Sequence, residues 1–155
     1  MASGVIDIAD EVLSQLDYVI AGVHSQMKMP KDKMTERIIR AMENPNVDII
    51  SHPTGRLLKR RDEYQIDFDR ILETAKKTGT ILEINSYPDR LDLNDQNIKK
   101  AIRAGVKLVI NTDTHEKSQM RYMELGIAQA RRGWAEKKDI VNCWSLGKLL
   151  KAFKK

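Results

Sequence analysis

Four short apolar runs divide the chain, and each is followed by a longer amphipathic segment. The apolar runs are rich in β-branched residues and predict strands at residues 18–23, 47–51, 81–85 and 108–112. The amphipathic segments repeat apolar side chains at helical spacing and predict helices at residues 33–43, 67–77, 95–104 and 119–131. Strands that alternate with helices of about ten residues indicate right-handed βαβ units and a parallel sheet. We therefore expect an α/β fold of parallel β/α units, with about four strands and flanking helices.

Helix boundaries are marked by residues with suitable capping chemistry. Asp32 and Asn94 precede two of the predicted helices and can accept hydrogen bonds from their first turns. Gly79 and Gly105 follow two predicted helices and can adopt the left-handed conformation that ends them. A short helix is also expected at residues 10–16, and Ser145 is expected to cap a terminal amphipathic helix.

The length limits how complete this architecture can be. A length of 155 residues predicts a single domain that covers residues 1–155. A closed (β/α) barrel has about eight strands and roughly 250 residues, so four strands indicate part of a barrel or a small open sheet. Mean hydropathy is −0.48, and no apolar run is long enough to span a bilayer. We expect a cytoplasmic protein with no signal peptide and no membrane contact.

Charge and cysteine content narrow the functional classes. The formal net charge is +5, and basic residues cluster at positions 59–61, 131–132 and 151–155. Such clusters fit a phosphate-bearing or nucleic-acid partner, with an ordinary solvated surface as the alternative. Cys143 is the only cysteine, which excludes an intramolecular disulfide framework and a cysteine-rich zinc site. We expect its thiol to be buried as a small hydrophobic group.

Each of the three histidines closes one of the apolar runs. His24, His52 and His115 follow three different predicted strands, and Asp113 lies two residues before His115. The carboxyl ends of parallel strands meet at one edge of a sheet, where α/β proteins place their ligands. Neutral imidazoles and a carboxylate suit Zn²⁺, Mn²⁺ or Fe²⁺. The sequence therefore predicts a shared divalent-metal site at this edge, although a surface role for each residue alone is the competing interpretation.

Other polar residues flank the same edge. Arg56 lies four residues beyond His52 and is placed for a bidentate contact with phosphate, and Lys28 is a weaker candidate of the same kind. Glu83 and Asn85 alternate within the third predicted strand, where a buried carboxylate needs a partner or a metal. Structural hydrogen bonds or solvent exposure are the alternatives for these side chains. Tyr87 and Arg90 border the edge as further substrate contacts.

Four of these segments together resemble a known superfamily. They read GVHS at residues 22–25, SHPTGR at 51–56, LEIN at 82–85 and NTDTH at 111–115. In order and spacing they resemble the PHP (polymerase and histidinol phosphatase) superfamily, and within it the C-terminal domain of bacterial and archaeal family X DNA polymerases. The resemblance implies a distorted seven-stranded β/α barrel that binds up to three metals, usually zinc or manganese. It also implies phosphoester hydrolysis, which in polymerase-linked members is 3′–5′ exonuclease and related DNA-end processing.

The resemblance also assigns roles to individual residues. His24 and His52 would ligate one metal, Asp113 a second and His115 a third, while Arg56 matches a loop arginine near the phosphate. Superfamily members carry a His-x-His motif and a bridging glutamate before the position of His24, and this sequence has neither. The expectation is the C-terminal portion of a PHP-like barrel. It would be completed by a missing N-terminal segment or polymerase domain, or would cover its open edge as a homodimer.

Three functions follow as hypotheses. The first is a metal-dependent phosphoesterase module that acts on a phosphoester substrate such as DNA and is incomplete in this chain. The second is a catalytically degenerate PHP scaffold or DNA-binding module. The third is a small-molecule phosphatase of the histidinol-phosphatase type.

Overall fold

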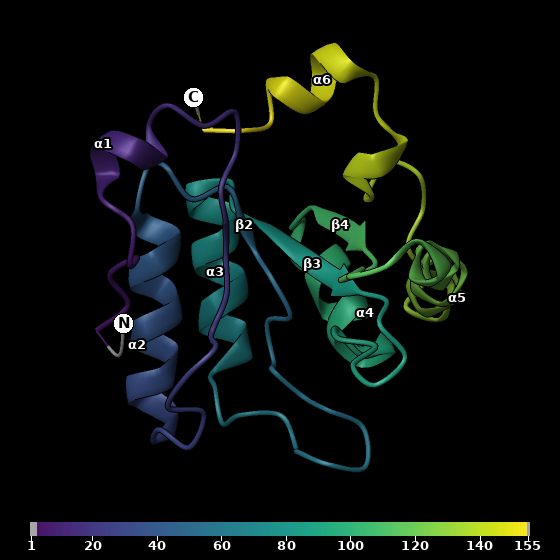
Figure 1. The fold of residues 1–155 in the computed structure, drawn as a ribbon, viewed down its shortest axis with the longest axis horizontal. Coiled ribbons are helices and arrows are strands. Elements are labelled where there is room, and N and C mark those ends of the chain that lie inside the picture. Colours follow the sequence, from purple (N-terminus) through teal and green to yellow (C-terminus); the bar gives the residue numbers. More distant parts are fainter. Residues whose placement is uncertain (1–2, 155) are drawn as a thin grey trace.

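The computed structural model describes residues 3–154, and its sheet confirms the expected fold class. Four parallel strands lie in the order β1-β2-β3-β4, flanked by helices (Figure 1). Their bounds are Ile20–Ala21 for β1, Ile49–Ile50 for β2, Ile81–Asn85 for β3 and Leu108–Asn111 for β4. This arrangement is consistent with part of a β/α barrel.

The helices occupy the positions that the amphipathic pattern predicts, with differences at their ends. The α-helices are α1 (Asp10–Leu13), α2 (Lys31–Glu43), α3 (Phe68–Thr78), α4 (Asp95–Ala104), α5 (Met123–Arg132) and α6 (Leu146–Leu150). Two 3₁₀ helices, η1 (Lys117–Tyr122) and η2 (Val141–Cys143), complete the set. No helix within residues 3–154 is long and apolar enough to cross a membrane.

Local capping explains where several helices begin and end. Asn94 accepts a hydrogen bond from the Asn97 amide at 2.8 Å, and Gly105 ends the same helix at a φ of 82°. The prediction for Asp32 is wrong, because α2 begins at Lys31 directly after Pro30. Asp32 instead lies in the first turn, where its negative charge still favours the helix N-terminus.

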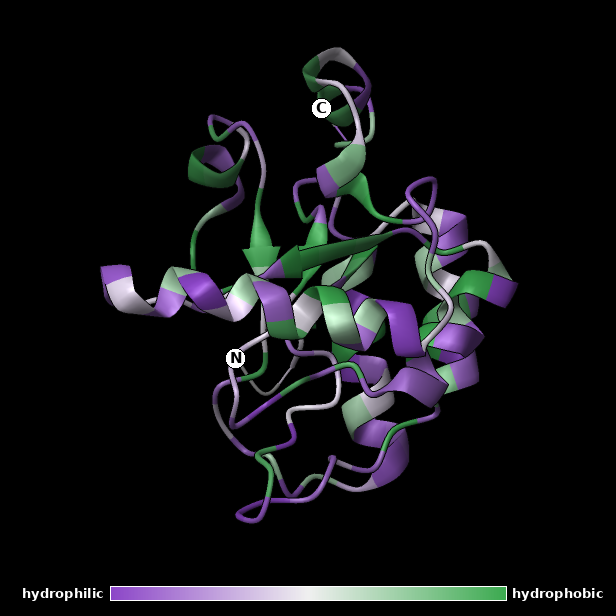
Figure 2. Ribbon diagram, turned by 90° about the vertical axis from the view of Figure 1, so that its right-hand side faces the viewer, coloured by the Kyte–Doolittle hydropathy of each residue, from purple (hydrophilic) through white to green (hydrophobic). Residues whose placement is uncertain are grey.

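The two faces of the sheet have different partners. Leu82, Ile84, Leu108 and Ile110 point to the main core. On the opposite face a smaller apolar cluster comprises Ile49, Ile81, Val109 and Val141, with Trp144, Leu149 and Phe153 packed against it. Figure 2 shows the strands as the most continuously hydrophobic part of the chain, with hydrophilic residues along the helices. Alternation along each strand sends neighbouring side chains to opposite faces.

The C-terminal segment crosses the sheet and returns to the second helix (Figure 1). The Lys154 ammonium donates to the carbonyl oxygen of Met42 at 2.7 Å, near the end of α2. This side chain of the basic tail is partly buried and bonded to the helix, so it is not part of a free basic surface. Burial lowers its pKa. The thiol of Cys143 is exposed, which corrects the expectation that it would be buried. The residue lies in a short 3₁₀ turn at the sheet margin rather than in the core.

A candidate metal centre

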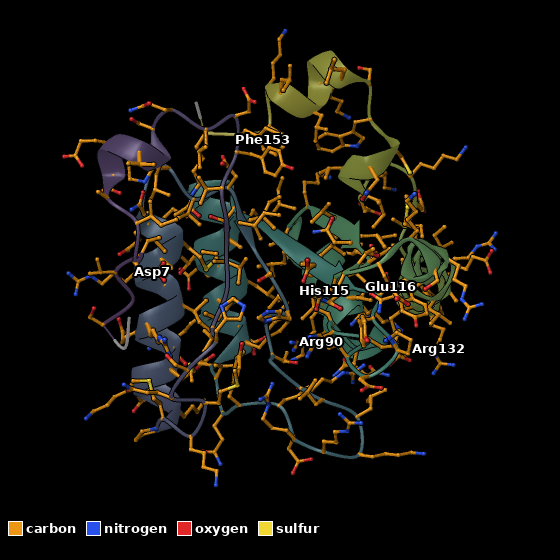
Figure 3. The ribbon with its side chains drawn as sticks, viewed as in Figure 1. Asp7, Arg90, His115, Glu116, Arg132 and Phe153 are labelled. Atoms are coloured by element: carbon orange, nitrogen blue, oxygen red, sulfur yellow. The ribbon has the colours of Figure 1, made fainter. Side chains whose placement is uncertain are left out.

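Four of the residues that the sequence singled out lie at the strand ends or just beyond them. His24 lies three residues after β1, His52 two residues after β2, and Asp113 two residues after β4, while Asn85 is the last residue of β3. Because all four strands are parallel, these positions share the carboxyl edge of the sheet. Figure 3 shows the labelled Arg90 and His115 near the arrowhead end of β3.

Two imidazoles, 28 residues apart in sequence, face each other at this edge. The Nε2 atoms of His24 and His52 are 3.3 Å apart, and the two rings are nearly perpendicular, at 87°. His52 is buried, whereas His24 is exposed. Burial, together with the charges of Arg90 and His24, lowers the pKa of His52 to about 4. His52 is therefore neutral at physiological pH, the form in which an imidazole can ligate a metal.

Gly22 lies beneath the imidazole pair, and sequence reasoning did not identify it as a site residue. A Cβ on Gly22 would overlap Ser51 Oγ and would lie 3.0 Å from the Cε1 atoms of both His24 and His52. The absence of a side chain at Gly22 therefore leaves the space that the two rings occupy. The sequence does contain a signal for this role: a glycine near the end of a strand, two residues before a candidate ligand, often marks a place where another group packs closely.

The geometry of the pair fits a divalent metal. At a tetrahedral zinc with Zn–N bonds of 2.0–2.1 Å, two ligand nitrogens lie about 3.3–3.4 Å apart. The Nε2 atoms of His24 and His52 already have this separation. Within residues 3–154, no group of three histidine, cysteine, aspartate or glutamate side chains gathers closely enough to hold an ion. The pair could therefore supply two ligands, and a complete site would need further ligands from elsewhere.

Backbone conformation sets two of the candidate ligands apart. His52 has a φ of 31° and Asp113 a φ of 53°, values in the left-handed region that non-glycine residues seldom adopt. Such conformations cost free energy and occur preferentially at functional sites. Each residue lies two positions after the end of its strand, where a left-handed backbone conformation stops the extended chain from continuing.

Asp113 contacts a cation and an amide instead of the imidazole pair. Its Oδ2 accepts hydrogen bonds from Arg90 Nε at 3.1 Å and from Asn85 Nδ2 at 3.2 Å. His115 is exposed, with its Nδ1 2.8 Å from the Asp113 carbonyl oxygen. The structure thus brings His24 and His52 together, holds Asp113 beside Arg90, and leaves His115 on the outer side of the same loop.

The Glu83 carboxylate accepts hydrogen bonds from residues at the ends of three strands. Its Oε2 accepts the His52 backbone N–H at 2.7 Å and the Asn85 side-chain amide at 3.1 Å. Its Oε1 accepts the Asn111 side-chain amide at 2.8 Å. Burial raises the pKa of Glu83, an effect that these three hydrogen bonds oppose. The structural hydrogen bonds that are the alternative interpretation of Glu83 and Asn85 are therefore present. Glu83 contacts the backbone of His52, and Asn85 contacts the side chain of Asp113.

The two predicted phosphate contacts lie outside this network. The Arg56 guanidinium donates from Nε to the Arg90 carbonyl at 2.9 Å and from Nη2 to the Leu91 carbonyl. Its Nη1 lies 3.8 Å from Glu63 Oε1. Arg56 therefore joins the loop after β2 to the loop after β3. Lys28 is exposed on the loop after β1. A role in phosphate binding stays a prediction for both residues.

A second buried carboxylate holds the loop that follows His52. Asp92 is fully buried and accepts hydrogen bonds from the Thr54 amide at 3.0 Å, the Thr54 hydroxyl at 2.8 Å and the Gly55 amide at 2.8 Å. Burial raises the pKa of Asp92 to about 7, although these hydrogen bonds oppose the shift. Asp92 therefore fixes the segment between His52 and Arg56 to the loop that carries Arg90.

Comparison with known proteins shows which families this chain resembles. No protein-family model matches the chain. The chain is 45% identical over 146 residues to "DNA polymerase/3'-5' exonuclease PolX" of Bacillus subtilis (strain 168), a match that covers 94% of the chain and 26% of that protein. It is 36% identical over 121 residues to a probable phosphatase of Thermoanaerobacter sp. (strain X514), covering 72% of the chain and 47% of the phosphatase. A probable phosphatase of Clostridium acetobutylicum is 34% identical over 122 residues, a match that covers 74% of the chain and 48% of that phosphatase.

The chain thus spans about a quarter of the polymerase and just under half of each phosphatase. The similar proteins are the kinds that the histidine and aspartate motifs indicated, a family X polymerase with exonuclease activity and phosphatases. The parallel sheet and the imidazoles at its carboxyl edge agree with the same assignment. The chain belongs to the PHP superfamily.

Proposed function

We propose that this chain is a metal-dependent phosphoesterase module that acts on phosphodiesters, with a DNA 3′ end as its substrate. The observation that supports this most directly is the imidazole pair, because the 3.3 Å between the Nε2 atoms of His24 and His52 suits two ligands of one ion. The proposed metal is Zn²⁺ or Mn²⁺. The proposed substrate class draws on the similarity to a polymerase/exonuclease and to phosphatases.

Each side chain has a distinct task in this proposal. His24 and His52 hold one metal, and Asp113 offers a carboxylate to another, with His115 on the same loop. A bound metal would supply Lewis-acid chemistry, lowering the pKa of a water ligand and offsetting negative charge on the phosphate oxygens. Arg90 presents a permanently charged, partly exposed guanidinium beside Asp113, where it can contact a phosphate oxygen.

The proposed centre needs more ligands than these residues provide. Tight binding of a catalytic zinc usually takes three protein ligands. We place the remaining ligands on a preceding segment of a longer protein or on a second copy of this chain. Equilibrium sedimentation would separate these arrangements, since the second predicts a dimer whose formation is strengthened by metal and the first predicts a monomer.

A metal titration coupled to an assay tests the proposal. The metal-free protein would be titrated with Mn²⁺ and Zn²⁺ and then assayed with bis-p-nitrophenyl phosphate, a phosphodiester, and p-nitrophenyl phosphate, a phosphomonoester. We expect metal binding that is lost in a His52→Ala, Asp113→Ala double variant. Because this chain provides only part of the ligand set, we expect low turnover, with the diester cleaved faster than the monoester. Equal metal binding by the parent and the double variant would contradict the metal site. Metal binding with turnover of the monoester alone would instead support a small-molecule phosphatase.

A basic hairpin beside the centre favours a nucleic-acid substrate. Leu57 and Arg61 pair across this hairpin, and Lys59 and Arg60 at its tip are exposed. The Leu58 amide donates to the Asp89 carbonyl at 2.6 Å, which fixes the hairpin against the loop of Arg90. Arg60 also lies 3.5 Å from the Asp89 carboxylate, so both cations are next to the loop that carries Arg90, where a polyanion could contact them.

Salt dependence of DNA binding tests this part of the proposal. A Lys59→Ala, Arg60→Ala variant should bind a labelled single-stranded oligonucleotide more weakly and show a shallower dependence on salt, because fewer counterions are released. Lys76→Ala, Lys77→Ala is the matched control, since both lysines are exposed near the end of α3. Equal losses in the two double variants would contradict a specific role for the hairpin. Salt-dependent binding without any turnover would favour the degenerate DNA-binding module.

A further inference from the structure

Trp134 is the most exposed of the large hydrophobic residues within residues 3–154, with 72% of its surface accessible to solvent. It follows α5, on the side of the molecule away from α2 (Figure 1). The Lys99 ammonium, on α4, lies 4.3 Å from the centroid of the indole ring. Gly133 allows this close approach of the two helices, because a Cβ at Gly133 would overlap the side chain of Ile98. The indole therefore meets a cation, while most of the residue is open to solvent.

The backbone at Trp134 has a conformation that favours glycine. Its φ is 66°, its amide donates to the Arg131 carbonyl, and the amide of Ala135 donates to the Ala130 carbonyl, both at 3.0 Å. These two hydrogen bonds define a Schellman motif, in which the left-handed position is usually glycine. The same pair of bonds ends α4 around Gly105, whose φ is 82°. The fold alone would therefore favour a glycine at position 134 as well.

Packing does not account for a tryptophan at this position. An indole that stays in solvent gains little from burial of apolar surface. Its cation–π contact with Lys99 stabilises the fold by no more than the left-handed backbone costs. Trp144, the other tryptophan, has Lys148 at 4.0 Å from its ring centroid but also packs against the smaller apolar cluster of the sheet. Trp134 thus presents an aromatic surface that folding does not use.

The cations around this indole lack acidic partners. Lys99 and Arg103 lie one turn apart on α4, and Arg131 lies in the last turn of α5. In the part of the chain that the structure describes, none of the three forms an ion pair with a carboxylate. An exposed aromatic ring among uncompensated positive charges is complementary to a ligand that combines flat rings with negative charges. Single-stranded nucleic acid has this chemistry.

We propose that the indole of Trp134 stacks on an unpaired base of single-stranded DNA. Lys99, Arg103 and Arg131 contact the phosphates next to that base. A single strand can turn the face of a base toward the indole, whereas a duplex keeps its bases stacked on one another. The choice of DNA rests on the proposed function, but the surface itself needs no metal.

The two tryptophans allow a direct test in the presence of EDTA, with a short oligothymidylate as the ligand. Trp134 is the remaining tryptophan in Trp144→Phe, and saturating single-stranded DNA should quench its fluorescence, whereas a duplex of the same strand should not. In Trp134→Gly, the fluorescence of Trp144 should not change. The affinity of Trp134→Gly for the labelled single strand should fall by about 5- to 100-fold. Its unfolding midpoint should stay within about 4 °C of that of the parent, or rise.

A pair of double variants tests the contribution of charge. Lys99→Gln, Arg131→Gln should weaken binding of the single strand and make its salt dependence shallower, because fewer counterions are released. Lys33→Gln, Arg40→Gln is the matched control, since it removes one lysine and one arginine from the exposed surface of α2. The control should lose clearly less affinity and should keep the quenching of Trp134.

Each other outcome would overturn the inference. Unquenched Trp134 at saturating single-stranded DNA would do so, as would a Trp134→Gly protein that binds the strand as tightly as the parent. An unfolded Trp134→Gly protein would show that the fold itself requires the indole. No quenching, together with a parent dimer that Trp134→Gly converts to a monomer, would assign the indole to a protein contact instead. A parent chain that binds no metal would refute the proposed centre and leave these results unaffected, because they are obtained in EDTA.

Discussion

Arg90 and Asp113 form an ion pair across the carboxyl ends of β3 and β4, with Arg90 Nε 3.1 Å from Asp113 Oδ2. Both side chains are partly buried, so the pair is less screened than one on the open surface. The guanidinium is the counter-ion of Asp113 in this structure. In the proposed centre, a divalent cation at Asp113 Oδ2 would compete with Arg90 for the same oxygen.

The first prediction concerns this competition. Replacing Arg90 by glutamine removes both the competitor and a repelling charge, so Mn²⁺ affinity should rise by roughly three- to tenfold, or about 1 kcal/mol. Calorimetric titration of the metal-free variant measures this change directly. Arg103→Gln is the control, because Arg103 is exposed on α4 and carries the same charge. An unchanged or lower affinity in Arg90→Gln would show that Arg90 supports the bound metal rather than competing with it.

The second prediction concerns Gly22. Alanine at this position would place a methyl group 3.0 Å from the Cε1 atoms of both imidazoles and against Ser51 Oγ. We expect the rings to separate and metal affinity to fall at least tenfold. Overpacking should also lower the stability of the metal-free protein by about 1–3 kcal/mol.

Gly147→Ala is the control for Gly22→Ala. Nothing lies within 4 Å of a Cβ on Gly147, which is in α6. Alanine is the better helix former, so this variant should keep metal affinity and gain up to about 1 kcal/mol of stability. A Gly22→Ala protein that binds metal as tightly as Gly147→Ala would contradict the interpretation that the glycine makes room for the ring pair.

The third prediction separates the two histidines by their burial. His52→Ala empties a buried position, whereas His24 is exposed. Both variants should lose tight metal binding. In the metal-free state His52→Ala should be less stable than His24→Ala by about 1–3 kcal/mol, because the cost of a core truncation depends on burial. Chemical denaturation of the two metal-free variants checks the ranking, and equal stabilities would place the ring of His52 outside the packed structure.

Sequence reasoning worked best where the signal is local. The bounds of β3 and α4 were predicted to the residue, because Asn94 and Gly105 cap the helix through their own backbone and side chain. Strands β1 and β2 are shorter than predicted, since ladder pairing depends on partner strands and the chain turns at His52. Ile127 falls on the apolar face of the helix predicted at residues 119–131, but it is 43% exposed. Periodicity defines an apolar face without saying whether another element covers it.

In the candidate site, too, the sequence predicts the local features but not the contacts that depend on the folded structure. The positions of His24, His52 and Asp113 at strand ends followed from the order of apolar runs, and the similarity to PolX and to phosphatases agrees with the family that those motifs indicated. The ion pair between Arg90 and Asp113 did not follow from the sequence, because it joins residues on different loops whose approach depends on the folded sheet. The same is true of the space beneath the imidazoles that Gly22 leaves open.

The last prediction concerns the pH dependence of stability through Asp92. Burial raises the pKa of this carboxyl from 3.8 to about 7, so the folded state favours its protonated form. A group whose pKa is raised on folding contributes stability that is fully present below the unfolded value, here 3.8. That contribution is lost as pH rises through the folded value, here about 7. Arg56 and Glu63 are the charged groups that act on Asp92, with opposite signs.

Asp92→Asn removes this titration while keeping an acceptor for the Thr54 and Gly55 amides. The free energy of unfolding of the variant, minus that of the parent, should therefore increase between pH 4 and pH 8 by a few kcal/mol. Urea denaturation at several pH values across this range, without metal, measures the difference. Taking the difference cancels the titration of groups common to both proteins, including His52. A difference that does not change with pH would mean that Asp92 stays ionised in the folded protein throughout, held by its hydrogen bonds despite its burial.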